Sequence, residues 1–298
     1  MKALPELYIL RPGEHRPSWR KRPGRSCNDP SPTAGGWARH AGTAVLSTNV
    51  PPRDPSGARC TGSGDGFHGT ARINTINTNT MNGEYWLSRW ASNKAGFHQM
   101  HVNAHLERWA DRLELAEGDA IFVPLAGKSR DMLWLAERGY RVIGVELSTI
   151  AVEAFFVEAK LDPVIEEHGA FTRYSSGSIG LLRGDFFDLA PDDLAGATAV
   201  YDRASLIAFP PAMRARYARH LASIVPSGTR MLLITVEYPD GEMEGPPFSV
   251  PEQEVRHLFG DHFTLDHLDE RDVLADNERF RQRGLTRLSE QVYLLRRA

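Results

Sequence analysis

The stretch AIFVPLAGKSRDMLWLAERGYRVIGVEL, residues 120–147, carries the pattern that decides the fold. Its two ends, AIFVP at 120–124 and RVIGVEL at 141–147, are short apolar runs bounded by turn signals, which predicts two buried strands. The segment KSRDMLWLAERG between them has helical spacing and ends at Gly139, a residue suited to the left-handed backbone that follows a helix. A strand, a helix and a second strand in this order are typical of a parallel sheet.

The same alternation of strands and helices continues toward the C-terminus. Ser148 is placed to cap the next helix, and a later helix is predicted over 212–225. Further apolar runs predict strands at 180–187, 197–203, 230–238, 262–273 and 289–297. The last two follow each other with no helix between them, which indicates an antiparallel strand in the edge region. We therefore expect an α/β fold with a doubly wound, mostly parallel seven-stranded sheet.

The first 80 residues differ in composition from the rest of the chain. Residues 1–80 contain 11 Lys and Arg against 5 Asp and Glu, nine of the 19 prolines, and both cysteines, Cys27 and Cys60. Their turn-forming and polar tracts have no periodicity that would bury a core, so we expect disorder there. We favour a translated extension upstream of a domain that begins at Met81. A transit peptide stays open as an alternative.

The composition of the whole chain excludes several classes of protein. It has 41% apolar residues, 24% charged residues and a formal net charge of −3, as in ordinary globular proteins. No run of about 18 apolar residues is present, so we expect no membrane partner. The weak overall charge gives no support for a nucleic-acid partner. Residues 81–298 contain no cysteine, which excludes a thiol site there and fits a reducing cytoplasm.

The turn after the first predicted strand, PLAGKS at 124–129, invites two nucleotide-binding interpretations. A phosphate-binding loop needs a glycine five residues before Gly127, where this chain has Phe122. A dinucleotide fingerprint fails as well, because Gly127 has no glycine partner two residues away. An ordinary strand-to-helix turn therefore stays open for this motif.

Polar residues end three of the predicted strands, at the edge where doubly wound sheets bind ligands. Glu146 is placed to accept hydrogen bonds from both hydroxyls of a ribose, because an ionised carboxylate only accepts. Asp185 is placed to face an adenine ring. Arg203 is placed at the centre of the cleft, where it suits an anionic substrate or a cofactor carboxylate. The alternatives are a solvated acid for Glu146, a turn-forming acid for Asp185, and, for Arg203, a salt bridge with Asp202 or a position on the surface.

Three histidines upstream of these strands, His98, His101 and His105, have the spacing of a metal site at first sight. His101 and His105 lie four apart on a predicted helix, as in HExxH, but no Glu follows His101 and no third ligand is evident. We therefore expect no metal site and solvent-facing histidines.

Seven strings then connect the chain to a known family. WLSRW, NKAGFH, VPLAGKSRDMLWL, GYRVIGVELS, GDFFDL, YDRASLIA and GPPFSV occur in that order within residues 81–298. With them this segment resembles a thiopurine S-methyltransferase of the bacterial type. The resemblance implies a Rossmann-like, class I methyltransferase fold that depends on S-adenosyl-L-methionine. One departure is Ala126, where many members have cysteine, and we expect little consequence because the turn contributes main-chain contacts.

The resemblance also implies which residues form the site. The implied cofactor contacts are Trp90, Leu125, Glu146, Asp185 and Arg203. Arg203 borders the substrate as well, so it is also the catalytic candidate. The implied substrate contacts, on the side that closes over the acceptor, are Phe97 and Arg279.

The function implied by the resemblance is methyl transfer from S-adenosyl-L-methionine to a soft nucleophile. The acceptor would be a small molecule, either a thiol, such as a thiopurine or aryl thiol, or a selenium or tellurium compound in metalloid detoxification. A thiolate needs no strong base, and the cofactor carries the activated methyl. We expect a monomer. The alternatives are a dinucleotide-dependent oxidoreductase and a non-catalytic nucleoside-binding protein on a related fold.

Overall fold

The two apolar runs that flank the 124–129 turn form neighbouring parallel strands, as predicted. In a computed structural model that describes residues 83–94, 99 and 101–298, β1 (Ala120–Val123) and β2 (Arg141–Glu146) pair in parallel, with Ala120 opposite Arg141 and Val123 opposite Gly144. Helix α3 (Asp131–Glu137) makes the crossover between them. Gly139 follows α3 with a φ of +87°, which is the left-handed conformation expected of it.

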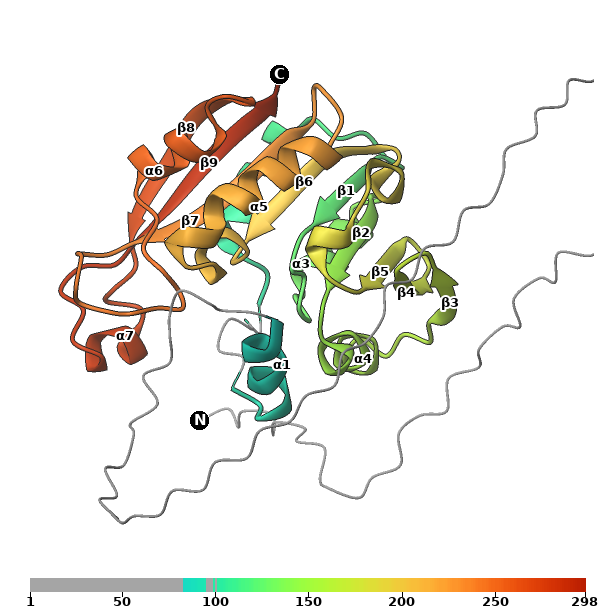
Figure 1. Cartoon of the computed structure of the whole chain (residues 1–298), viewed down its shortest axis with the longest axis horizontal. Helices are drawn as coiled ribbons and strands as arrows, with labels where there is room; N and C mark the ends of the chain where they lie inside the picture. The colour runs from blue at the N-terminus through green and yellow to red at the C-terminus, as the bar shows by residue number, and fades with distance from the viewer. Residues whose placement is uncertain (1–82, 95–98, 100) are drawn as a thin grey trace, which may run out of the picture. The chain divides into compact units, whose positions relative to one another are not determined.

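These two strands lie near the centre of a nine-stranded sheet, in the order β3-β4-β5-β2-β1-β6-β7-β9-β8 (Figure 1). The five central strands, from β5 to β7, are all parallel, and β9 runs antiparallel between β7 and β8. The strands outside the first pair are β3 (Val164–His168), β4 (Phe171–Ser176), β5 (Ile179–Arg183), β6 (Ala197–Arg203), β7 (Arg230–Glu237), β8 (Phe263–Asp272) and β9 (Ser289–Arg297). The fold class and the inserted antiparallel strand are therefore confirmed.

The predicted number of seven strands is wrong by one hairpin. Strands β3 and β4 pair antiparallel with each other, and β4 adds the hairpin to the edge of the sheet next to β5. The sequence VIEEH of β3 gave no strand signal, because only Ile165 among its five side chains is buried. An edge strand that faces water on most positions lacks the apolar run that marks a buried strand.

Helices cover both faces of the sheet, as a doubly wound fold requires. On one face α5 (Pro211–Ile224) and α6 (Glu252–Phe259) pack in a cluster that contains Phe122. On the other face α2 (Ala104–Trp109), α3 and α4 (Thr149–Glu158) pack in a cluster that contains Ile121 and Val123. Neighbouring side chains of β1 thus enter opposite clusters, which follows from the alternation of side chains along a strand.

Two short α-helices and four short 3-10 helices complete the described part of the chain. Helix α1 (Gly83–Ala91) lies beyond the arrowheads of β2 and β6, next to α4 (Figure 1). Helix α7 (Glu278–Gln282) lies in the long connection between β8 and β9, so the expectation of no helix between the last two strands is wrong. Among the described helices none is long and apolar enough to cross a membrane. The predicted disorder of residues 1–80 and the position of Phe97 lie outside the described residues.

Candidate active site

A cavity of about 490 Å³ lies at the carboxyl ends of the parallel strands. Residues from the ends of β1, β2, β5 and β6 line it, and α1 and α5 contribute side chains from either side. All five predicted cofactor contacts line this first cavity, namely Trp90, Leu125, Glu146, Asp185 and Arg203. The edge of the sheet that the strand pattern singled out is therefore hollow, and the structure brings these five residues to one place.

The turn after β1 has an unusual backbone conformation where it borders the first cavity. Leu125 has a φ of +44° and Gly127 a φ of +54°, a region that side chains rarely occupy. A Cβ on Gly127 would lie 3.3 Å from the indole of Trp90, so α1 packs closely on this turn. The Ala126 amide donates to the carbonyl of Val145 at 2.8 Å. The turn is thereby tied to β2, and its backbone faces the cavity.

Glu146 ends β2 with its side chain 7% exposed. One carboxyl oxygen accepts a hydrogen bond from the Gly127 amide at 2.9 Å, and the other accepts from the Ser148 amide at 2.8 Å. Burial nevertheless raises the pKa of Glu146 to about 7, because the backbone donors only partly offset the loss of solvent. The alternative of a solvated acid is wrong. Each oxygen keeps lone pairs for a further donor, which suits two hydroxyl groups.

Arg203 ends β6 and enters the first cavity held by a buried acid. Its Nε donates to Asp131 Oδ2 at 2.8 Å, and the same oxygen accepts from the hydroxyl of Tyr201 at 3.0 Å. Burial alone would lower the pKa of Arg203, but the neighbouring Tyr201 and Asp131, together with Glu290, raise it above its ordinary value. The guanidinium is therefore a fixed, permanent cation at the centre of the site.

The alternative of a salt bridge between Arg203 and Asp202 is wrong. Asp202 is fully buried on the opposite face of β6, where it accepts from the hydroxyl of Tyr217 at 2.6 Å and from the Ser205 amide at 3.3 Å. Ser205 Oγ in turn donates to the carbonyl of Pro124 at 2.9 Å. These bonds connect the loops after β1 and β6, so Asp202 supports the floor of the cavity.

Asp185 and an aromatic wall close the side of the cavity next to β5. The Asp185 carboxyl accepts from the Phe187 amide at 2.9 Å, so its turn-forming role is real and coexists with a place in the cavity wall. The rings of Phe187 and Phe209 lie 5.9 Å apart, and the guanidinium of Arg216 lies 3.8 Å from the centre of the Phe187 ring. A flat heterocycle would find both an aromatic surface and a carboxylate here.

A second cavity of about 280 Å³ adjoins the first one. Arg203 and Ala204 line both cavities, so these two residues separate the second cavity from the first. Arg279, a predicted substrate contact, lies in its wall beside Phe280. Burial and the neighbouring cations Arg283 and Arg89 lower the pKa of Arg279. The other predicted substrate contact, Phe97, lies outside the described residues.

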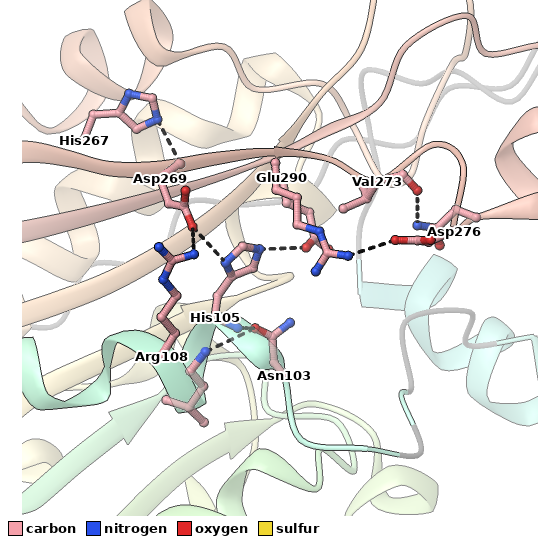
Figure 2. Close-up of polar contacts among 11 residues, drawn as sticks. Asn103, His105, Arg108, His267, Asp269, Val273, Asp276 and Glu290 are labelled. Atoms are coloured by element: carbon pink, nitrogen blue, oxygen red, sulfur yellow. Dashed lines mark hydrogen bonds and ion pairs between the residues drawn. The ribbon is translucent and has the colours of Figure 1, made fainter.

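The expectation of solvent-facing histidines is wrong for His105. Its side chain is 6% exposed, and its Nε2 lies 2.9 Å from Glu290 Oε2 (Figure 2). Glu290 lines the second cavity. The Nδ1 of the same ring lies 3.9 Å from Asp269 Oδ2. Helical spacing gave no sign of this burial, because Glu290 is 185 residues away in sequence. Within the described residues no cluster of three or more His, Cys, Asp or Glu could hold a metal ion.

Several residues of the site were not singled out in the sequence. The acid Asp131 lies within the VPLAGKSRDMLWL string without having been assigned a role, and the ring of Phe209 and the guanidinium of Arg216 come from a loop and a helix with no distinctive motif. Asp131 had one usable signal, since it lies two residues after the GKS turn and begins α3. Phe209 and Arg216 had none, because their contribution depends on how α5 packs beside the end of β5.

The fold and the first cavity together define a class of protein. The strand order, with β9 inserted antiparallel, and a buried acid at the end of β2 are the arrangement of class I S-adenosyl-L-methionine-dependent methyltransferases. The residues present fit a nucleoside cofactor: a tight glycine turn where a Cβ would lie 3.3 Å from Trp90, an acid with free acceptor capacity and an aromatic wall.

Comparison with known proteins narrows the class to a family. The thiopurine S-methyltransferase family model matches residues 81–298, and the chain belongs to this family. The thiopurine S-methyltransferase of Pseudomonas paraeruginosa is 49% identical over 217 residues, which cover 73% of this chain and 100% of that protein. Those of Pseudomonas fluorescens and Nitrosospira multiformis are each 50% identical over 217 residues, covering 72% of this chain and 99% and 98% of those proteins.

Proposed function

We propose that this protein transfers the methyl group of S-adenosyl-L-methionine to the sulfur of a small thiol. The observation that carries the proposal is Glu146, a buried carboxyl that lies in the same cavity as the fixed cation Arg203. The carboxyl of Glu146 suits the hydroxyl donors of a ribose, and the guanidinium of Arg203 suits the negative charge of a carboxylate or a thiolate. Membership of the thiopurine S-methyltransferase family supports the same reaction.

The first cavity is the proposed cofactor site. Glu146 would accept hydrogen bonds from the two ribose hydroxyls, Asp185 would face the adenine, and Trp90 would pack over the ligand together with the turn backbone at Leu125, since all four residues line this cavity. Because the amides of Gly127 and Ser148 already fix the carboxyl of Glu146, that group is oriented before the ligand arrives. A preorganised acceptor loses little conformational freedom on binding.

The second cavity is the proposed acceptor site. When bound, the cofactor supplies a methyl group on a positively charged sulfur, which makes the methyl carbon electrophilic. Arg203 lines both cavities and would hold a thiolate by electrostatic attraction, and Arg279 lines the second cavity. Phe97 is the other substrate contact that we propose. The protein's own contribution is to align the acceptor sulfur with the methyl carbon and to keep water away.

The acceptor we propose is an aryl or heterocyclic thiol, with selenium and tellurium anions as further soft nucleophiles. Support comes from the relatives, which are thiopurine S-methyltransferases, and from the two arginines that line the second cavity. We further propose that the protein acts on such compounds in the cytoplasm and as a monomer. Detoxification of metalloids is the role that this chemistry suits.

The test combines calorimetry with a methyl-transfer assay. We expect the protein to bind S-adenosyl-L-methionine and to methylate aryl thiols, and Glu146→Ala to weaken cofactor binding about 100-fold through the loss of two charge-assisted hydrogen bonds. Glu166→Ala, at an exposed position of the edge strand β3, is the control and leaves binding unchanged. Binding of a nicotinamide dinucleotide in place of S-adenosyl-L-methionine would contradict the proposal and favour an oxidoreductase.

A further inference from the structure

Glu290 brings a carboxylate into the wall of the second cavity. It lies on β9 and shares that cavity with Arg203 and Arg279. Among the described residues that line the second cavity, Glu290 is the only acid. Neither arginine can accept a proton, because a guanidinium stays protonated in proteins and offers only donors. Glu290 is therefore the ionisable acceptor that an acceptor molecule would meet in this cavity.

The buried imidazole of His105 holds Glu290 in place. Its Nε2 lies 2.9 Å from Glu290 Oε2 (Figure 2), and the side chain of His105 is buried. Because an ionised carboxylate only accepts, the Nε2–H of the imidazole is the donor. The start of α2 is fixed as well, since the side chain of Asn103 accepts from the amides of His105 and Leu106. The capped start of α2 therefore holds His105, and His105 in turn orients the carboxylate of Glu290.

On the side of the His105 ring away from Glu290, two further charged residues connect it to the surface of the protein. Behind the imidazole, Asp269 Oδ2 lies 3.9 Å from Nδ1 and accepts from Arg108 at 3.1 Å (Figure 2). The side chain of Arg108 is 65% exposed. His105 therefore lies between two carboxylates, one of which faces the cavity and one of which is paired at the surface. This arrangement leaves Glu290 with one buried partner and its remaining acceptor capacity free for a ligand.

We propose that Glu290 is the proton acceptor for neutral thiols, and that His105 is its positioning residue. The proposal rests on the proposed function. As the acceptor sulfur attacks, its S–H bond breaks and the proton passes to an oxygen of Glu290. The sulfur's electron pair forms the new bond to the methyl carbon, whose bond to the donor sulfur breaks with both electrons remaining on that sulfur. The proton is then released to solvent.

Glu290 should affect neutral thiols and ionised thiols in different ways. A thiol that is already ionised at the assay pH has no proton to give, so Arg203 suffices for it and the Glu290 carboxylate only repels it. A neutral thiol gains a hydrogen bond to Glu290 and a path for its proton. Positioned general bases contribute about 10²–10⁴-fold to such steps. The charged and titratable groups around Glu290 that set this balance are His105, Arg203 and Arg279, together with Arg271 and Asp269 on β8, where Arg271 pairs directly opposite Glu290.

The kinetic test uses two aryl thiols of matched size at pH 7, one with a pKa well below 7 and one well above it. We expect Glu290→Gln to lower kcat/KM about 100-fold for the neutral thiol and less than 3-fold for the ionised one. Glu270→Gln makes the same chemical change at an exposed position of the neighbouring strand β8 and alters neither. Equal losses for both thiols, or no loss for either, would overturn the proposal.

A binding test reports on Glu290 without turnover. In the presence of S-adenosylhomocysteine, which carries no methyl group to transfer, calorimetry gives the dissociation constants of both thiols. We expect Glu290→Gln to bind the ionised thiol about 5-fold more tightly and the neutral thiol about 5-fold more weakly, because a carboxylate repels an anion and accepts from S–H. Shifts of the same sign for both thiols would contradict the role of Glu290.

The role of His105 is tested through the same selectivity. His105→Phe should reduce kcat/KM about 10-fold for the neutral thiol only, with no further loss when it is combined with Glu290→Gln. A loss that is equal for both thiols or additive in the double variant would make His105 merely structural. If the wild-type protein methylates neither thiol, the proposed function fails, and the binding measurement still decides whether Glu290 distinguishes the two protonation states.

Discussion

Arg203 Nε lies 2.8 Å from Asp131 Oδ2, so the end of β6 is tied to the start of α3 across the mouth of the first cavity. Asp131 is itself 1% exposed, and its other carboxyl oxygen accepts from the Asn103 amide at 2.9 Å. Asp131 is therefore a buried structural residue that does not line the cavity, whereas the guanidinium of Arg203 does. A cation that is fixed in this way can act on a ligand without paying to be ordered first.

This relationship predicts the effect of Arg203→Ala. We expect turnover to fall at least about 10-fold while the dissociation constant of S-adenosyl-L-methionine changes less than about 3-fold, because Arg203 faces the acceptor side and Glu146 still holds the ribose. Single-turnover kinetics and calorimetry measure the two quantities. Asp131→Asn should lower turnover in the same direction, since it releases the guanidinium. Unchanged turnover in Arg203→Ala would remove Arg203 from the reaction.

The strands of the core could be predicted from the sequence because their apolar runs and flanking turns are local signals. The assignment of Glu146 followed from its position at a strand end, since the carboxyl ends of parallel strands meet at one edge. The edge strand β3 escaped prediction because VIEEH buries one side chain only. His105 escaped because the acid that pairs with it, Glu290, comes from a strand at the far end of the chain. Contacts of that kind are fixed by tertiary packing and leave no periodic signal.

Gly127 and Gly177 form a matched pair for testing the turn beside Trp90. Both have a positive φ, of +54° and +57°, but a Cβ on Gly127 would lie 3.3 Å from the indole whereas nothing lies within 4 Å of one on Gly177. Alanine at either position costs about 1 kcal/mol of folding free energy through backbone strain. We expect Gly127→Ala alone to weaken cofactor binding, about 10-fold, and to change the tryptophan fluorescence. Equal cofactor affinity in both variants would show that the turn at Gly127 does not contribute to cofactor binding.

Deletion of residues 1–80 should leave the fold and the activity intact. The family model begins at residue 81, and full-length relatives are matched by 217 residues of this chain. The described core clusters draw all their buried side chains from Leu106 onward. We expect the same melting temperature within about 2 °C and the same kcat/KM as the whole chain. Loss of folded, active protein on truncation would show that the segment contributes to the domain.

The raised pKa of Glu146 predicts how stability and cofactor binding depend on pH. Its folded-state value of about 7 lies above the ordinary value of 4.5, so the folded state holds the proton more tightly than the unfolded state. Stability from this group is therefore fully present below pH 4.5 and is lost as the pH rises to 7, by about 3 kcal/mol. Urea unfolding of the wild type at pH 5 and 8 measures this slope.

Glu146→Ala is the reference that isolates this group, because it retains every other titration. The difference in unfolding free energy between wild type and variant should move in favour of the variant as the pH rises from 5 to 8. S-adenosyl-L-methionine needs the ionised acid, so its affinity for the wild type should rise with pH up to about 7 and stay level above it. Parallel pH dependence in both proteins would show that Glu146 is ionised throughout, and that its burial costs less than its surroundings indicate.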